Sequence, residues 1–194
     1  MHLKYSFLFL MLLMTGCSNQ QALPTDHYYR LPELIGVSKG EKRFHLVSII
    51  NFQADGLLNE RAIVYTHDDI EFNQYHYHNW VDAPSRLLTE RLAEWFRLSD
   101  FSEVVLTTYE GNSELIIKGK IKSFERLRYG NNDSVRVGVV LQVNSHDKNL
   151  PVLFEEYSEI IVAESHSITD AVIAFGKAVD SIFTQFQDDL NERL

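Results

Sequence analysis

The sequence predicts an α/β sandwich, in which a mixed, largely antiparallel sheet is covered by two main amphipathic helices. Segments with strand patterns follow one another across short polar connections, which favours antiparallel hairpins. Two other segments carry a single apolar stripe at helical spacing, so each has one face to bury against a sheet. The chain has 194 residues, of which 45% are hydrophobic, and this length suits one domain with its own core.

Four strand-like segments precede the first predicted helix. They are rich in aromatic and β-branched residues, and the second alternates so that Phe44, Leu46, Ile50 and Phe52 share one face. We therefore expect strands over residues 27–31, 44–52, 62–66 and 70–78.

The first predicted helix starts near Pro84, because a proline without an N–H group loses nothing in a first helical turn. Asp82 is placed to cap this helix, since a carboxylate accepts hydrogen bonds from the free N–H groups of a helix start. One stripe of the helix is formed by Leu88, Leu92, Trp95, Phe96 and Ser99. This spacing predicts an amphipathic helix of about 14–16 residues.

Four more strands are expected over residues 103–109, 114–129, 133–144 and 152–163. The third has the clearest pattern in the chain, with five alternating apolar residues over 135–143. The apolar residues of the second and third strands are all odd-numbered, and opposed residues of an antiparallel pair point to the same face. The connection should therefore hold an odd number of residues.

A connection of three residues, 130–132, satisfies this parity. A five-residue connection also satisfies it but sets Arg128 opposite Arg136, and directly opposed like charges are unfavourable. We therefore prefer the three-residue connection. A bulge within residues 123–126 would break the parity.

The second helix is expected to begin after Ser167, because Ser167-Ile168-Thr169-Asp170 resembles a capping box with Asp in place of Glu. A core-facing stripe then continues in steps of three and four residues through Ile168, Val172, Phe175, Val179, Ile182, Phe186 and Leu190. The pattern predicts a helix of roughly 23 residues.

The N-terminus has the parts of a lipoprotein signal. A basic start at Lys4 is followed by eight apolar residues (7–14), small residues and then Cys17. The apolar run is too short to cross a bilayer and fits a secretory signal peptide. Thr15-Gly16-Cys17 resembles the end of a bacterial lipobox, in which cleavage precedes a cysteine that becomes acylated.

We therefore expect a signal peptide over residues 1–16, a lipidated cysteine and polar tether over 17–26, and a single α/β domain over 27–194. Several acyl chains on Cys17 would anchor the domain stably. By resemblance to proteobacterial lipoproteins, Ser18 after the cysteine favours sorting to the outer membrane. The expected location is the periplasmic face of that membrane.

The net charge and the cysteine content argue against several classes of partner and binding site. The formal net charge is −9, which disfavours nucleic acid as a partner because phosphate neutralisation supplies most of that affinity. Cys17 is the single cysteine, so neither an internal disulfide nor a cysteine-rich zinc site can form.

No motif for catalysis or cofactor binding is found in the sequence. It has no Gly-x-Ser-x-Gly elbow and no glycine-rich phosphate loop. His76 and His78 form a His-x-His pair that could share a metal, but no third ligand is fixed, so we favour solvent-facing histidines. We expect a non-enzymatic protein without a metal or other cofactor.

A row of basic residues marks one predicted interaction surface. Lys118, Lys120 and Lys122, with Arg126 and Arg128, are all even-numbered and would share a face of one continuous strand. The row is either a patch for an acidic partner or anionic lipid headgroups, or a solvated face kept soluble by lysine.

Aromatic residues mark a second part of the predicted surface. Tyr75, Tyr77 and Trp80 lie among histidines and an asparagine, and tyrosine and tryptophan are enriched at interfaces. The alternative for Trp80 is a core position where a strand meets the first helix. Self-association of the domain would have to use exposed side chains such as Tyr75 and Tyr77.

Several short motifs follow the lipobox cysteine in order: Tyr29-x-Leu31-Pro32, Arg61-x-Ile63-Val64-Tyr65, Tyr77-x-x-Trp80 with Pro84 and Leu87-Leu88 behind it, and Phe101-x-x-Val104. Together they resemble the ABC-type transport auxiliary lipoprotein family, the PqiC/YmbA-like group, over nearly the whole mature chain.

The resemblance implies a fold similar to the TolB N-terminal and anticodon-binding-like domains. It implies a non-enzymatic outer-membrane subunit of a transport system that moves lipids between the two membranes. Such a subunit would form a homo-oligomeric ring and receive a periplasmic subunit of the MCE type. The alternative function is a lipoprotein activator or assembly factor for cell-envelope enzymes, which would share the anchor but need no oligomer.

Overall fold

A computed structural model describes residues 24–109, 111–129 and 132–194. The predicted signal peptide and Cys17 lie outside these residues. The described elements are β1 (His27–Tyr29), β2 (Phe44–Ile49), η1 (Gly56–Asn59), β3 (Ala62–Thr66), β4 (Phe72–Trp80), α2 (Pro84–Leu98), β5 (Ser102–Leu106), β6 (Leu115–Tyr129), β7 (Asn132–Ser145), β8 (Leu153–Val162) and α3 (Ile168–Arg193).

The sheet is organised around the long strand β6. One edge of β6 pairs antiparallel with β7 along its whole length, and β8 adds to the far side of β7. The other edge of β6 pairs in parallel with β2 in its first half and with β3 in its second half. β5 extends the sheet beyond β2, and β4 and β1 extend it beyond β3. The sheet is therefore mixed, with antiparallel pairing along its longest strands.

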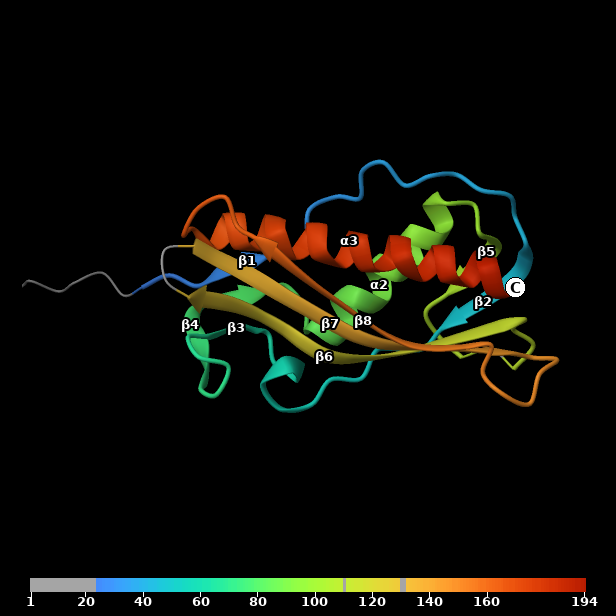
Figure 1. Ribbon diagram of the computed structural model, residues 1–194, viewed down its shortest axis with the longest axis horizontal. Helices are drawn as coiled ribbons and strands as arrows, with labels where there is room; N and C mark the ends of the chain where they lie inside the picture. Colours follow the sequence, from blue (N-terminus) through green and yellow to red (C-terminus); the bar gives the residue numbers. More distant parts are fainter. Residues whose placement is uncertain (1–23, 110, 130–131) are drawn as a thin grey trace, which may run out of the picture.

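Both helices lie on the same face of this sheet (Figure 1). α3 packs over β7 and β8, and α2 packs over β2, β5 and β6. The α/β sandwich expected from the sequence is confirmed, and the opposite face of the sheet carries no α-helix among the described residues. No helix in the described ranges is long and apolar enough to cross a membrane.

Polar contacts fasten the two helices to each other. The Arg91 guanidinium donates to both carboxylate oxygens of Asp180, at 2.7 and 2.8 Å, and to the Pro32 carbonyl at 2.5 Å. The Trp95 indole N–H donates to the Gln187 amide oxygen at 2.6 Å. These bonds satisfy polar groups that helix packing would otherwise bury without partners.

Most predicted elements are confirmed with shifts of a few residues at their ends. The Ser167 hydroxyl caps α3 by accepting the Asp170 N–H, as expected. The predicted cap at Asp82 is wrong. Ala83 occupies the cap position, and because its methyl group cannot accept a hydrogen bond, no side chain caps α2.

The predicted three-residue connection between β6 and β7 is wrong. Tyr129 pairs with Asn132, so two residues, 130 and 131, separate the paired positions. The register shifts by one between Ile121 and Ser123, because Lys122 is an extra residue on β6. The odd-numbered residues before this bulge face the helices, as predicted, whereas after the bulge the even-numbered residues do.

Candidate interaction surface on the uncovered sheet face

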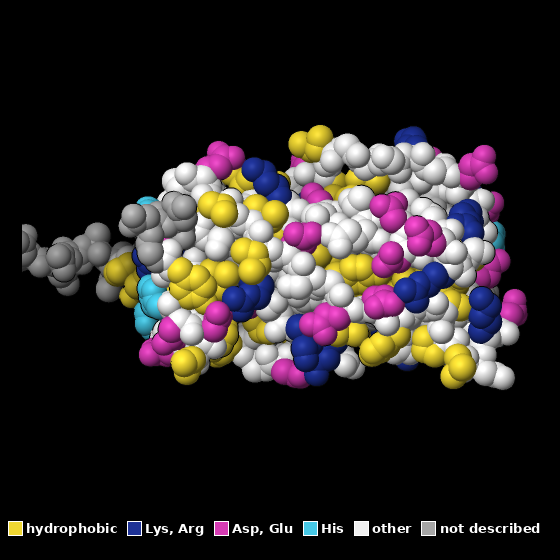
Figure 2. Space-filling view, in the orientation of Figure 1, with side chains coloured by type: hydrophobic (Ala, Val, Ile, Leu, Met, Phe, Trp, Pro, Cys, Tyr) yellow, Lys and Arg dark blue, Asp and Glu magenta, His cyan; other side chains and the backbone are white. Residues whose placement is uncertain are grey.

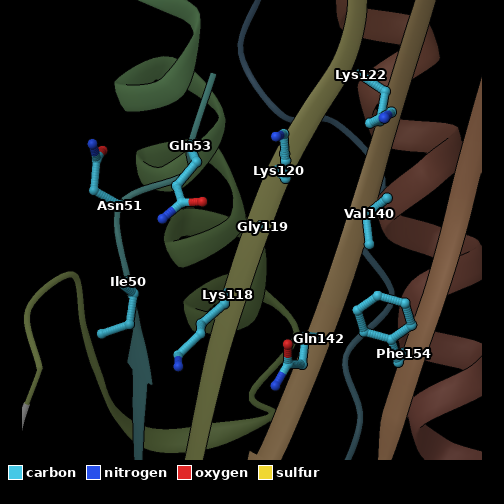
Figure 3. Close-up of a pocket in the computed structure, with 10 residues that line it drawn as sticks. All are labelled: Ile50, Asn51, Gln53, Lys118, Gly119, Lys120, Lys122, Val140, Gln142 and Phe154. Carbon is cyan, nitrogen blue, oxygen red and sulfur yellow. The ribbon is translucent and has the colours of Figure 1, made fainter. Parts of the chain in front are cut away.

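The three predicted lysines lie side by side on the face of the sheet that neither α2 nor α3 covers, called the uncovered face below (Figure 3). Lys118, Lys120 and Lys122 point away from α2 and α3, which lie behind the sheet in Figure 3. Their neighbours on β6 point the other way, and Ile117 and Ile121 are buried under the helices. Strand alternation therefore separates the lysines from the core.

Arg126 does not belong to this row, which corrects the predicted five-residue face. Because the bulge precedes it, Arg126 faces the helix side and only 2% of it is exposed. Its guanidinium forms an ion pair with Asp133, and it donates to the Tyr75 hydroxyl at 2.9 Å and to the His166 carbonyl at 2.6 Å. Arg128 is also even-numbered and also follows the bulge, so it points to the same side of the sheet as Arg126.

A polar segment beside the row is fixed to β6 by backbone bonds. The Gln53 N–H donates to Gly119 O, and the Ile121 N–H donates to Gln53 O, both at 2.8 Å. The Phe52 ring packs so closely on Gly119 that a Cβ there would lie 2.6 Å from ring atoms. A glycine is therefore required at this point of β6, and Asn51 and Gln53 are held next to the lysines.

These elements enclose a groove of about 500 Å³ on the uncovered face. The lysine row forms its floor, and apolar side chains of β7 and β8 form one wall. Its lining comprises Ile50, Asn51, Gln53, Lys118, Gly119, Lys120, Lys122, Val140, Gln142 and Phe154 (Figure 3). The groove thus combines positive charge with apolar surface.

The three lysines differ in how their charges are paired. Lys120 forms an ion pair with Asp55 at 2.6 Å, and this contact lowers the pKa of the Asp55 carboxyl. Lys118 and Lys122 form no ion pair with any of the described residues. Two cations on this face are therefore available to an anionic partner.

A second hollow of about 350 Å³ adjoins the groove at Lys122. Its apolar walls come from η1, β3 and β4, and Glu125 and Arg136 lie in its floor, 3.2 Å apart. Burial raises the pKa of the Glu125 carboxyl to about 7, against the smaller opposing effects of the Phe124 N–H bond and Arg136. Arg136 also binds Asp69 at 2.8 Å, which ties the β3–β4 turn to β7.

The predicted aromatic part of the surface divides between core and surface. Trp80 is 1% exposed and packs against Phe124 and Phe175, with both ring centroids at 5.3 Å. The core alternative for Trp80 is therefore the one observed. Tyr75 is half-buried and held by Arg126, whereas Tyr77 is exposed.

The two histidines of the His-x-His pair have different surroundings. His76 is exposed, whereas His78 stacks on His27 and its Nδ1 lies 2.9 Å from the Tyr29 hydroxyl. Burial, followed by the charges of His27 and Arg126, lowers the pKa of His78. Within the residues that the structure describes, no group of three or more His, Cys, Asp or Glu side chains is placed to hold a metal ion.

The sequence reasoning missed the apolar contribution to this face. Val140 and Phe154 occupy positions that alternate with the buried residues of β7 and β8, so polar side chains would be expected there. An apolar residue at a solvent position of an alternating strand is the signal that could have found them. Figure 2, drawn in the orientation of Figure 1, shows several groups of exposed hydrophobic side chains among acidic and basic ones.

Comparison with protein-family models and with curated proteins gives no match. Comparison with solved structures finds several similar proteins. A protein of Xanthomonas campestris from the family DUF330 is 13% identical and has a TM-score of 0.66, over 84% of this chain and 91% of that one. A second, uncharacterized protein is 12% identical with a TM-score of 0.70, over 86% of this chain and 99% of that one.

A hypothetical protein from Chlamydia trachomatis is also similar, with 10% identity and a TM-score of 0.50, over 77% of this chain and 97% of that one. At these low identities the likeness shows the fold alone. The described domain therefore has the fold of a DUF330 protein, and the likeness extends over most of the lengths compared.

Proposed function

We propose that this chain is a non-enzymatic, lipid-anchored subunit of an MCE/ABC-type intermembrane lipid transport system, located at the periplasmic face of the outer membrane. Its domain docks an acidic surface of a periplasmic MCE-type subunit on the uncovered sheet face. The observation that carries the docking role is the lysine row, in which Lys118 and Lys122 have no ion-pair partner among the described residues.

Two further observations support this assignment. The ordered motifs around Tyr29, Arg61, Trp80 and Phe101 resemble the PqiC/YmbA-like auxiliary lipoproteins. The fold agrees with that of a DUF330 protein, and DUF330 is the PqiC/YmbA-like group. Docking requires neither a catalytic group nor a cofactor, so the proposed role is non-enzymatic and free of metal.

Cys17 is the proposed site of lipidation. Replacing it in a Cys17→Ser variant removes the acyl acceptor, so the variant should leave the outer-membrane fraction and appear in the soluble periplasmic fraction. Fractionation followed by immunoblotting measures this. Retention of Cys17→Ser in the outer membrane after a high-salt wash would contradict the anchor.

The docking role is tested by chemical cross-linking in cells, purification of the tagged chain from outer membranes, and mass spectrometry of what is joined to it. We expect an MCE-type subunit. A Lys118→Glu/Lys122→Glu variant should lower its yield roughly tenfold or more, because each reversal converts an attraction to an acidic surface into a repulsion.

A Lys39→Glu/Lys177→Glu variant is the matched control, since it changes the net charge equally. Lys39 pairs with Asp100 just after α2, and Lys177 lies on α3, away from the row. An unchanged yield with the Lys118/Lys122 variant would remove the lysine row from the interface. Recovery of a cell-envelope enzyme in place of an MCE-type subunit would instead favour the activator function.

The proposed subunit acts as a homo-oligomer, with a ring as the expected form. The exposed ring of Tyr77, at the end of the domain that carries β1 and β4, is available for such contacts. Light scattering on the domain in solution should give a mass larger than one chain. Only monomer at tens of micromolar would contradict self-association.

A further inference from the structure

The outer edge of β8 is a long strand edge without a partner among the described residues. β8 pairs with β7 on one side, and no backbone hydrogen bond joins its other side to any described segment. An edge of this kind is a template for pairing with another chain, and proteins commonly shorten, charge or cover it. Here ten residues from Leu153 to Val162 remain uncovered.

Hydrogen-bond parity identifies which residues form this free edge. The Ala163 N–H donates to Asp133 O at 2.9 Å, in register with the β7–β8 ladder. Because bonded and non-bonded pairs alternate in an antiparallel ladder, the odd-numbered residues of β8 direct their N–H and C=O groups to β7. The even-numbered residues, 154–162, direct theirs outward.

The side chains of those even-numbered residues lie on the uncovered face. Three are large and apolar, and Phe154, Ile160 and Val162 are 64%, 55% and 62% exposed. Glu156 and Ser158 lie between them and are also exposed. The free edge therefore has apolar side chains at both ends and polar ones at its centre.

We propose that this edge pairs with the same edge of a second copy, in an antiparallel two-fold contact centred on Ser158. The free N–H and C=O groups of residues 154–162 then face their equivalents in the partner. Phe154 lies opposite the partner's Val162, which joins apolar groups twice across the axis, and Ser158 lies opposite itself. The sheet continues across two copies.

The carboxylates of β8 select this register. Centring the pair on Glu156 or on Glu159 sets a carboxylate opposite itself, and centring it on Tyr157 sets Glu155 opposite the partner's Glu159. Directly opposed like charges are unfavourable. Of the four registers centred on residues 156–159, the one at Ser158 alone sets no two carboxylates opposite each other.

A two-fold contact uses the same surface on both copies and closes at two. A larger assembly would need a second surface, such as the Tyr77 end. Since the strands run along the long axis of the domain, with β1 at one end (Figure 1), the two β1 ends would lie at opposite ends of the pair. The inference concerns the domain itself and does not rest on the proposed function.

The test is disulfide trapping in the full chain. Ser158→Cys places two cysteines across the axis, with Cα atoms about 5.5 Å apart in a bonded pair, within the range of a disulfide. Under oxidising conditions we expect a dimer on a non-reducing gel that disappears on reduction. The chain without the substitution controls for cross-linking through Cys17.

Two further cysteine variants verify the register. Glu156→Cys lies opposite the partner's Ile160, so two copies of this variant hold their cysteines more than about 10 Å apart and should not cross-link. Mixing Glu156→Cys with Ile160→Cys should give a mixed dimer. Absence of a Ser158→Cys dimer, or equal cross-linking by Glu156→Cys alone, overturns the proposal.

A charge variant tests the contact without a disulfide. Ile160→Glu should abolish pairing through β8 and lower the mass that light scattering measures, because it sets a carboxylate opposite the partner's Glu156 on both sides of the axis. Ile70→Glu is the matched control, since Ile70 is 86% exposed in the β3–β4 turn, away from β8. Pairing through β8 that persists in Ile160→Glu at the wild-type level also overturns the proposal, and circular dichroism confirms that both variants are folded.

Discussion

The two halves of β6 lie in the same sheet but use charge in opposite ways. Before the bulge, residues 115–121 bury apolar side chains under the helices and direct lysines outward. After the bulge, Arg126 lies under the helix side and Glu125 lies in the floor of a hollow on the other face, both 2% exposed. The first half leaves its charges in water, whereas the second half buries two of its three, Glu125 and Arg126, and leaves Arg128 exposed.

The difference shows what burying a charge requires. Arg126 is surrounded by Asp133, the Tyr75 hydroxyl and the His166 carbonyl, and Glu125 accepts from the Phe124 N–H at 2.7 Å and from Arg136. The lysines of the first half need no such partners. We therefore expect substitutions in the second half to affect stability and those at the lysines to affect association.

The largest effect is expected from Arg126→Ala. This change removes the guanidinium that pairs with Asp133, which is 4% exposed and otherwise has the His166 ring 3.3 Å away, and should lower the free energy of unfolding by about 3–5 kcal/mol. Urea unfolding followed by circular dichroism measures it. An Arg126→Met/Asp133→Leu double variant removes both charges and should recover most of the loss. A double variant as unstable as Arg126→Ala would show that packing, and not the ion pair, dominates.

The next largest effect is the part of the pH dependence of stability that Glu125 contributes. Its pKa of about 7 in the folded chain lies above its ordinary value of 4.5, so the folded chain holds this proton to higher pH than the unfolded chain. Its stabilising contribution is complete below about pH 4.5 and decreases by about 3 kcal/mol as pH rises to 7. Glu125→Gln should abolish this part of the dependence.

The measurement is the free energy of urea unfolding from pH 4.5 to 8, taken as the difference between wild type and Glu125→Gln at each pH. Taking the difference cancels the opposite trend of exposed carboxyls with lowered pKa values, such as those of Asp55 and Asp69. A difference that stays constant over this range would contradict a raised pKa for Glu125.

A smaller effect is expected at Gly119, where the first half of β6 meets the core. Gly119→Ala would place a Cβ 2.6 Å from the Phe52 ring, which is 1% exposed, and should cost about 1–3 kcal/mol of stability. Gly138→Ala is the control beside the bulge, because its Cβ meets the Ser123 hydroxyl, which can rotate away. Thermal unfolding should show a larger loss of stability for Gly119→Ala than for Gly138→Ala. Equal losses in the two variants would contradict this prediction.

The smallest effect on stability is expected at the free lysines. Lys118→Ala and Lys122→Ala remove exposed side chains without an ion-pair partner among the described residues, so unfolding free energies should change by about 0.5 kcal/mol or less. Urea unfolding measures this as well. A loss above 1 kcal/mol, close to the losses expected in the second half, would contradict the contrast between the two halves.

The sequence by itself determined the elements that depend on neighbouring residues. The apolar stripes of both helices, the alternation over 135–143 and the Ser167 cap are set by side chains within a few positions of each other. The outward direction of Lys118, Lys120 and Lys122 followed from the same local rule. These features could be predicted because a helix or strand repeat is visible in consecutive residues.

Only the tertiary structure decided the features that join distant segments. The parallel pairing of β2 and β3 with the two halves of β6, and the groove that Asn51 and Phe154 share with the lysines, bring together residues far apart in sequence. The bulge at Lys122 and the burial of Arg126 belong to the same class. A single extra residue reverses which side chains face the core, and whether the reversal is stable depends on Asp133, Tyr75 and the His166 carbonyl, partners that no local pattern specifies.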